Sequence, residues 1–210
     1  DQMRWEEIWD VALRIRNHFL RTPLPNALRC SIADAVTATF AGDALVARSS
    51  AADEDTAQTS FAGLHESYVN IQGEENILKH VRLVWASLWS DRALLYRSEL
   101  GLDVKASSMA VILQKLTHGN ASGVLFTQNP STRGTMVIEA VHGLNQGLVD
   151  GAVEPDQWVI DRADGTTVAH RTAERVHAVQ AVPGGSTGLQ PLAATTACRL
   201  PLSAAALTEL

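Results

Sequence analysis

The sequence predicts an α+β fold, in which helices pack on a mostly antiparallel sheet and two subdomains form. In residues 5–101 apolar side chains recur mainly at spacings of three and four, which are typical of amphipathic helices. From residue 107 onward, short runs of branched residues alternate with Gly, Asn, Pro and Ser clusters, which are typical of strands joined by turns. Because helices and strands come in blocks, alternating βαβ units and a parallel sheet are not predicted.

Four helices are expected before residue 102. The first begins at Trp5 and ends before Pro23 and Pro25, and the second is capped by Asn26 and ends at Gly42. The third carries an apolar stripe over residues 77–88, and the fourth begins after a cap at residues 90–91. Four tryptophans lie on these stripes and are expected in the core: Trp5, Trp9, Trp85 and Trp89.

The strands are expected to be short. Residues 43–48 form an apolar strand, residues 49–63 a polar loop, and residues 65–71 a second strand. Further strands are expected in SMAVILQKL, SGVLFTQ, TMVIEAV and QWVIDR, and Asp164–Gly165 predicts a hairpin turn before TTVAHRTAERVHAV. The segment PGGSTG is expected to be a flexible loop, and Ser203 is expected to cap a last helix.

Composition excludes several classes of protein. The net charge is −6 with both signs scattered, which argues against a general nucleic-acid or membrane-surface binder. Cys30 and Cys198 lie far apart without metal-ligand spacing, so a reducing, cytoplasmic compartment fits. The sequence contains neither a zinc motif nor a GxSxG elbow, and no apolar run has membrane length. Because the chain begins with Asp1 and ends within an expected helix, we expect it to be a piece of a longer protein.

Arg48 follows an apolar run and precedes a small, hydroxylated and acidic segment. A guanidinium presents a planar set of donors that suits phosphate oxygens. Ser49 and Ser50 add hydroxyl donors, and Gly63 lets backbone approach a ligand closely. The alternative is that Arg48 pairs with one of the acids that follow it in a merely solvated loop, and residue types alone leave both interpretations open: Asp53, Glu54 and Asp55.

Gln114 and Lys115 end the expected strand AVILQKL. Strand alternation sends one of them toward a cleft and the other to the opposite face. A glutamine amide can bind an adenine edge through donor and acceptor together, and a lysine can bind phosphate as a point charge. The alternative, two solvated residues at a sheet rim, is the more common situation.

The segment HGLNQGLVDGAVEPD, residues 142–156, carries three glycines after an expected strand. It is similar to a phosphate-binding turn, although its spacing is neither that of a Walker A loop nor that of a dinucleotide fingerprint. Glu139, Glu154 and Asp156 offer carboxylates that suit magnesium. A cap or turn role is the more common one for each of them.

Taken together, five segments resemble the nucleotide-binding domain of the phosphoenolpyruvate synthase and pyruvate phosphate dikinase family, which rifampin phosphotransferase shares. The first, ARSSAADEDTAQTSFAGLHESYVNI, is similar to the family pattern (V/A)RSSAxxED followed by SFAGxxxTxLN. Four more follow in the family's order: VWASLWSDRALLYR, MAVILQKL, ASGVLFTQNPSTR and VEPDQWVI. The resemblance covers residues 44–160, and the Gln-Lys pair is most similar to the phosphoenolpyruvate synthase branch.

The resemblance implies an ATP-grasp-like fold that holds ATP between two lobes, with ATP and Mg²⁺ as cofactors. Carried over by position, Arg48 contacts the nucleotide phosphates, and Gln114 lines the nucleotide site. Gly63 and Ser67 match loop positions near the phosphates, with Ser67 where threonine is usual. Ser49, Ser50 and Lys115 are further candidates.

The resemblance also implies a division of labour along a longer polypeptide. The family uses ATP to phosphorylate a histidine on another domain and passes the phosphoryl group to pyruvate or another acceptor through a further domain. We expect residues 1–45 to be the helical part of the first lobe, 46–182 the nucleotide-binding core, and 183–210 a loop and the start of a further segment. No catalytic residue or metal ligand is expected here, because their family positions would lie before Asp1 or beyond Leu210.

One departure from the family pattern bears on function. The family's glycine turn usually reads GLGE, whereas this chain has GLNQ at residues 143–146. Asn145 tolerates a left-handed backbone, but Gln146 lacks the carboxylate. This departure favours one alternative to phosphoenolpyruvate synthesis, a non-catalytic nucleotide-binding or regulatory module. The other alternative is a rifampin-phosphotransferase-like enzyme, because the acceptor would be determined by other domains.

Overall fold

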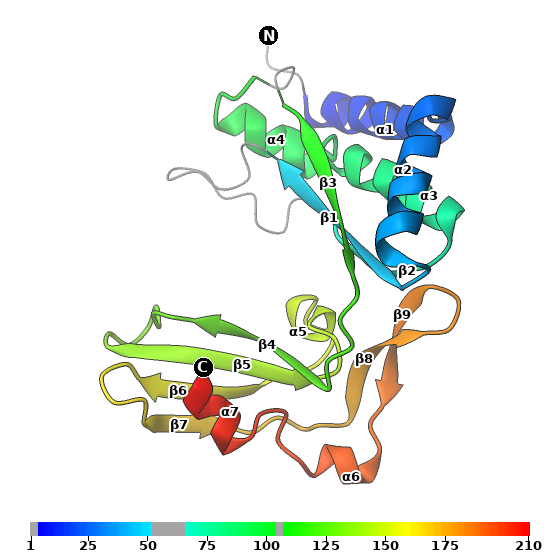
Figure 1. The fold of residues 1–210 in the computed structure, drawn as a ribbon. Coiled ribbons are helices and arrows are strands. Elements are labelled where there is room, and N and C mark those ends of the chain that lie inside the picture. The colour runs from blue at the N-terminus through cyan, green and yellow to red at the C-terminus, as the bar shows by residue number, and fades with distance from the viewer. Residues whose placement is uncertain (1–3, 52–65, 104–106) are drawn as a thin grey trace. The chain divides into compact units, whose positions relative to one another are not determined.

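The computed structural model describes residues 4–51, 66–103 and 107–210. The chain forms two compact units, Asp1–Leu116 and Thr117–Leu210. Every ladder between named strands is antiparallel and the helices are separate from the strands in sequence, so the predicted α+β class is confirmed (Figure 1). The expected division of the chain into three functional segments, residues 1–45, 46–182 and 183–210, stays a prediction.

The described residues of unit 1 form four helices and a three-stranded sheet of order β2-β1-β3. Its elements are α1 (Trp5–Arg21), α2 (Asn26–Phe40), β1 (Leu45–Ala51), β2 (Tyr68–Ile71), α3 (Glu74–Ser87), α4 (Asp91–Glu99) and β3 (Met109–Lys115). The core lies between the sheet and helices α2 and α3, where Leu45 and Ala47 are fully buried. Val36 and Phe40 of α2 and Ile77 of α3 pack against them.

The helix boundaries follow from local chemistry. The Ser90 hydroxyl accepts the Ala93 backbone N–H at 3.2 Å and caps α4, as predicted. At the end of α2, Ala41 and Gly42 turn left-handed with φ of 48° and 88°. Asn26, the expected cap of α2, is instead its first residue, and Pro25 stands at the cap.

Two further expectations for unit 1 were wrong. Trp5 and Trp9 are 68% and 51% exposed, because α1 contacts α3 and α4 with its other face. Strand β1 does not end at Arg48 but continues to Ala51, because residues 49–51 keep pairing with β3. Arg48 therefore lies in the middle of a strand and not at its tip.

Unit 2 consists of a four-stranded sheet of order β4-β5-β6-β7, a β8–β9 hairpin and three short helices. Its elements are β4 (Ala121–Phe126), β5 (Thr135–His142), α5 (Gln146–Val149), β6 (Asp156–Asp161), β7 (Thr167–Arg171), β8 (His177–Val182), β9 (Ser186–Pro191), α6 (Ala194–Ala197) and α7 (Ala204–Glu209). Ile138 and Trp158 are at the centre of its core, and Leu202 and Leu207 of the last segment cover them.

The turns of unit 2 follow the sequence in part. The expected hairpin at Asp164–Gly165 joins β6 to β7, with Gly165 left-handed at φ 73°. The segment PGGSTG is not a flexible loop, since Gly184 and Gly185 form a tight turn and residues 186–191 pair with β8. None of the described helices is both long and apolar enough to span a membrane.

Candidate functional site

Strands β1 and β3 present two chemically different faces. In the antiparallel register Leu45 pairs with Lys115, Ala47 with Leu113, and Ser49 with Val111, and this face packs against the helices. The alternate residues point to the other face, because side chains alternate along a strand. The second face is open to solvent and carries three of the polar residues that the sequence singled out, Arg48, Ser50 and Gln114.

Arg48 lies at the centre of this open face. It pairs directly with Ile112, while Gln114 pairs with Val46, so Arg48 and Gln114 are diagonal neighbours on one surface. Arg48 and Gln114 are both exposed, and Ile112, which pairs with Arg48, is 48% exposed. We call this surface, made of Val46, Arg48, Ser50, Ala110, Ile112 and Gln114, the Arg48 face.

The structure distributes the predicted serines between the two faces. Ser50 pairs with Ala110 on the Arg48 face, whereas Ser49 pairs with Val111 on the helix-covered face. Ser67 is exposed and immediately precedes Tyr68, which pairs with Ala47, so the register brings Ser67 alongside Arg48. Three predicted residues, Arg48, Ser67 and Gln114, therefore come together around one surface.

Lys115 is directed away from that surface. Its position pairs with Leu45, on the opposite face from Gln114, as strand alternation requires. The Lys115 ammonium lies 2.7 Å from an Asp43 carboxylate oxygen in an exposed ion pair. In this arrangement the lysine charge is engaged by Asp43 at the end of the strand.

Gly63 and the acids Asp53, Glu54 and Asp55 lie outside the described residues. Among the residues that are described, no carboxylate lies within 4.0 Å of the Arg48 guanidinium. The pairing of Arg48 with one of the acids after it therefore stays an alternative prediction.

A tyrosine at the edge of the site has a strongly perturbed ionisation. Burial, and to a smaller extent the negative charge of Glu66, raises the pKa of Tyr68 to about 12. Its ring makes an edge-on contact with the His80 ring at a centroid distance of 4.9 Å. Tyr68 is therefore neutral at physiological pH and anchors β2 beside Ser67.

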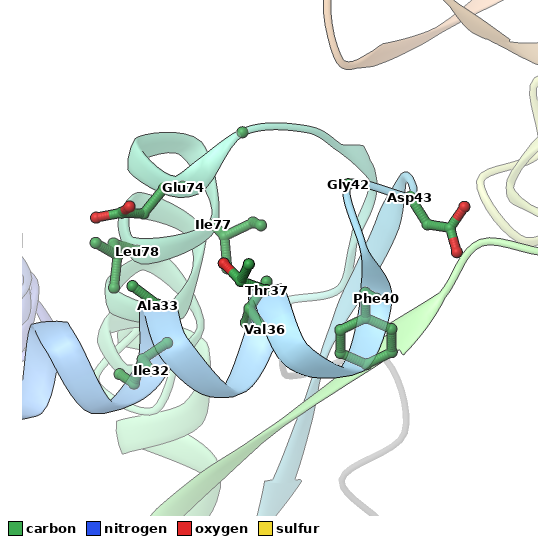
Figure 2. A pocket seen from close by; sticks show the side chains of 11 residues that line it. Ile32, Ala33, Val36, Thr37, Phe40, Gly42, Asp43, Glu74, Ile77 and Leu78 are labelled. Atoms are coloured by element: carbon green, nitrogen blue, oxygen red, sulfur yellow. The ribbon is translucent and has the colours of Figure 1, made fainter.

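An apolar hollow lies between α2 and α3 and does not belong to the Arg48 face. Ile32, Val36, Phe40, Ile77 and Leu78 point into it from the two helices (Figure 2). These helices cover the other face of the sheet, and Phe40 and Ile77 belong to the unit 1 core. The lining of the hollow is mainly apolar, and its charged side chains are the carboxylates of Asp43 and Glu74, which do not suit a phosphate.

The carboxylates considered for magnesium are each engaged inside unit 2. Glu139 accepts a hydrogen bond from the Gln157 amide at 2.7 Å, and Glu154 pairs with Arg171 at 2.6 Å. Within the described parts of the chain, no group of three or more His, Cys, Asp or Glu side chains is placed to hold a metal ion.

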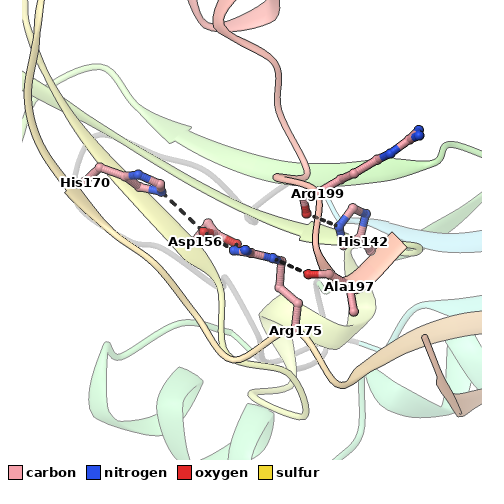
Figure 3. Close-up of polar contacts among 6 residues, drawn as sticks. All are labelled: His142, Asp156, His170, Arg175, Ala197 and Arg199. Atoms are coloured by element: carbon pink, nitrogen blue, oxygen red, sulfur yellow. Dashed lines mark hydrogen bonds and ion pairs between the residues drawn. The ribbon is translucent and has the colours of Figure 1, made fainter. Parts of the chain in front are cut away.

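Asp156 belongs to a buried polar cluster (Figure 3). It is 1% exposed, and Arg175 donates to its two carboxylate oxygens at 2.8 and 3.0 Å. His170 Nε2 lies 3.3 Å from the same carboxylate, and the His170 ring stacks on Trp158 at a centroid distance of 4.6 Å. Arg175 also donates to the Ala197 carbonyl at 3.0 Å. The cluster ties the segment around α6 to the sheet, which is a structural role.

The GLNQ turn is built tightly into unit 2. Gly143 is left-handed at φ 79°, and a Cβ there would lie 2.5 Å from the Val179 carbonyl oxygen, so glycine is required. Asn145, which was expected to tolerate a left-handed backbone, has φ −59° and is right-handed. Gln146 Oε1 accepts a hydrogen bond from the Thr187 hydroxyl at 2.7 Å, so the amide supplies the acceptor that a glutamate would also supply.

Two residues of the site region were not identified by sequence reasoning. Ile112 reads as a core position in an apolar run, and only its pairing with Arg48 shows that it is on the open face. Arg97 resembles a ligand-binding arginine at the end of VWASLWSDRALLYR, yet it is 2% exposed and donates to the Leu88 carbonyl at 2.6 Å. The available signal for Ile112 was that it lies two positions before Gln114, so strand alternation puts both side chains on the same face.

Comparison with known proteins supplies the family. The whole chain, residues 1–210, matches the family described as pyruvate phosphate dikinase, AMP/ATP-binding domain. A phosphoenolpyruvate synthase from Aeropyrum pernix is 42% identical over 168 residues, which is 77% of this chain and 20% of that protein. A rifampicin phosphotransferase from a Streptomyces species is 38% identical over 194 residues, 91% of this chain and 22% of that protein.

A third relative is a transferase with a different name. The prodigiosin synthesizing transferase PigC from Serratia marcescens is 34% identical over 173 residues, 81% of this chain and 19% of that protein. The chain thus spans about a fifth of the length of the curated relatives it matches. The family match over the full chain, together with the relatives above 30% identity, shows that the chain belongs to the pyruvate phosphate dikinase AMP/ATP-binding domain family.

Proposed function

We propose that this chain is the ATP-binding part of a phosphotransferase and that the Arg48 face holds the nucleotide. The observation that carries the proposal is the register that puts Arg48, Ile112 and Gln114 on one open surface with Ser67 beside it. The family description, an AMP/ATP-binding domain, supports a nucleotide as the ligand. An ATP-grasp-like arrangement of lobes and a cytoplasmic location belong to the same proposal.

The residues of this face divide the work by their chemistry. The Arg48 guanidinium neutralises phosphate charge, and the hydroxyls of Ser50 and Ser67 add donors. Gln114 offers an amide donor and acceptor to the polar edge of a base, while Ile112 offers apolar surface to a ribose or base. Phosphoryl transfer needs mainly positioning and charge neutralisation, so a rigid strand is a suitable support for the arginine.

Magnesium enters this proposal with the nucleotide. Magnesium is commonly held by one or two carboxylates together with substrate phosphates. The described residues hold no suitable cluster, and the carboxylates of unit 2 are engaged elsewhere, so they do not fit a metal site. We therefore assign no metal ligand among the described residues.

The rest of the reaction concerns other parts of the polypeptide. We infer that ATP phosphorylates a histidine on another domain and that the phosphoryl group then passes to an acceptor. Pyruvate is the first candidate, because the phosphoenolpyruvate synthase relative has the higher identity of the two main relatives, 42% against 38%. A rifamycin-type acceptor is the second, because the rifampicin phosphotransferase covers more of the chain, 91% against 77%.

A non-catalytic nucleotide module stays the remaining alternative. The GLNQ turn does not by itself favour it, because Gln146 makes its hydrogen bond to Thr187 without a carboxylate. An assay of the complete natural protein separates the three possibilities. ATP consumption that depends on pyruvate or on a rifamycin identifies the enzyme class, whereas ATP binding without any consumption identifies the module.

The proposal is tested by isothermal titration calorimetry of ATP with the complete natural protein. Arg48→Ala is expected to weaken ATP binding tenfold or more, because it removes a charge-assisted phosphate contact worth about 1.5–3 kcal/mol. Arg92→Ala, which removes another exposed charge, from α4, is the matched control and is expected to leave affinity unchanged. Equal affinities for Arg48→Ala and Arg92→Ala would overturn the assignment of the Arg48 face.

A further inference from the structure

A second, chemically distinct pocket lies within unit 2. It is a hollow of about 730 Å³, within the size range of small-molecule sites. We call it the His142 pocket. Its polar side chains come from residues far apart in the sequence: His118, Asn120, His142, Gln180, Thr196 and Arg199.

The charge of the residues that line this pocket is opposite in sign to the net charge of the chain. The chain carries a net charge of −6, yet all fifteen residues that line the pocket are non-acidic. Arg199 contributes a fixed positive charge, and His118 and His142 are two groups that gain one on protonation. A lining with cations and without carboxylates favours an anionic ligand.

His142 is held in one orientation by its backbone partner. The residue is 9% exposed, and its Nε2 lies 3.0 Å from the Arg199 carbonyl oxygen. Because a carbonyl can only accept, Nε2 must carry the proton, and the neutral ring then keeps its lone pair on Nδ1. Among the described residues Nδ1 has no partner, and it is not sealed away from the pocket that His142 lines.

Arg199 supplies a positive charge among the residues that line the pocket. Its side chain is exposed and makes no ion pair with any described residue. In Figure 3 it extends outward beyond His142 and away from the Asp156–Arg175 pair. The guanidinium is therefore available to a ligand, unlike that of Arg175.

The walls of the pocket are fixed before any ligand arrives. Arg175 donates to the Ala197 carbonyl at 3.0 Å, and the Leu144 N–H donates to the Val179 carbonyl at 2.8 Å. The Ser122 hydroxyl donates to the Gly143 carbonyl at 2.6 Å. These bonds hold the three segments that carry His142, Gln180 and Arg199, so a ligand does not have to organise them.

We propose that the His142 pocket binds a small oxyanion, such as a phosphate monoester or a carboxylate, at a site separate from the Arg48 face. Arg199 provides the charge-assisted contact, and Nδ1 of His142 takes up a proton from solvent on binding and donates a hydrogen bond to the anion. Thr196 and Gln180 add neutral donors. Binding therefore couples anion capture to uptake of one proton by His142.

The test is nitrogen NMR of the histidine side chains in the complete natural protein, with inorganic phosphate as the probe. The Nδ1 signal of His142 is expected to change from that of an unprotonated nitrogen to that of a protonated one as phosphate is added. Acetate, added in a parallel titration, distinguishes a carboxylate site from a phosphate site. A change of the Nδ1 signal with either anion supports the proposal. An Nδ1 signal that changes with neither phosphate nor acetate overturns it.

Variants separate this site from the rest of the molecule. Arg199→Gln is expected to weaken the His142 response tenfold or more, whereas Arg162→Gln, an exposed arginine elsewhere in unit 2, is expected to leave it unchanged. Arg48→Ala should also leave it unchanged, since the Arg48 face is a different surface. If Arg199→Gln responds like the natural protein, the pocket does not bind the anion as proposed.

Discussion

Arg48 illustrates how a single position acquires its role from its neighbours. On its own the residue is an exposed arginine in a strand, a common feature of soluble proteins. The β1–β3 register places it opposite Ile112 and diagonal to Gln114, which turns three separate residues into one surface. Motif resemblance suggests Arg48 and Gln114, whereas Ile112 belongs to no motif and is placed on this face only by strand alternation from Gln114 and by its pairing with Arg48.

Arg97 shows the opposite case at the same scale. It occupies a motif position of the family, and an arginine in a motif invites a ligand-binding role. Instead it is 2% exposed and donates to the carbonyl of Leu88, at the end of α3. The guanidinium satisfies a helix-terminal carbonyl and fixes α4 to α3, so this motif residue preserves the fold.

Tyr68 gives a prediction for the pH dependence of stability. Its pKa is raised from 10.0 to about 12 in the folded protein, so the folded state holds the proton more tightly than the unfolded state between these values. Stability from this group is complete below pH 10 and is lost as pH rises toward about 12. Urea unfolding across this window should show a steeper loss of unfolding free energy for the natural protein than for Tyr68→Phe.

The control for this prediction is the same comparison at neutral pH. There the tyrosine is protonated in both states, so the difference between the two proteins should not vary with pH. Parallel curves for the natural protein and Tyr68→Phe between pH 10 and about 12 would contradict the assigned burial effect.

At the scale of elements, the two arginine–carboxylate pairs of unit 2 make different contributions. The Arg175–Asp156 pair is buried, with side chains 16% and 1% exposed, whereas the Arg171–Glu154 pair is open at 53% and 57%. Arg175→Met is expected to destabilise the protein by about 3–5 kcal/mol, because it leaves a buried carboxylate without its cation. Arg171→Met should cost less than about 1 kcal/mol.

The measurement is thermal and chemical unfolding of both variants beside the natural protein. Both substitutions remove one positive charge from unit 2, so the comparison isolates burial. Similar losses for the two variants would show that the Asp156 cluster does not anchor the segment around α6 as the hydrogen bonds indicate.

Elements also show how far sequence reasoning reached. The predicted helices and strands correspond to observed elements, because their periodicity and caps are local properties. The register of β1 beyond Arg48, and the pairing of residues 186–191 with β8, depended on partners elsewhere in the chain. The prediction that the tryptophans of α1 are buried was also wrong. Both lie on a helical stripe, but no described element of unit 1 covers them.

For the whole molecule, the central claim is that the Arg48 face binds ATP through its phosphates. Carrying the site across from the family gave Arg48, Gln114 and Ser67, and the structure places them around one surface. Gly63 lies outside the described residues, and Lys115 is engaged by Asp43. If Arg48 contacts the phosphates, the affinity that is lost when Arg48 is removed should increase with the number of phosphates on the nucleotide.

The most direct test compares the affinities of adenosine, AMP, ADP and ATP for the complete natural protein, Arg48→Ala and Gln114→Ala, by calorimetry. Arg48→Ala should lose tenfold or more for ATP, progressively less as phosphates are removed, and nothing for adenosine. Gln114→Ala should weaken all four ligands by a similar factor. A loss in Arg48→Ala that is equal for adenosine and ATP, or absent for both, would contradict the claim.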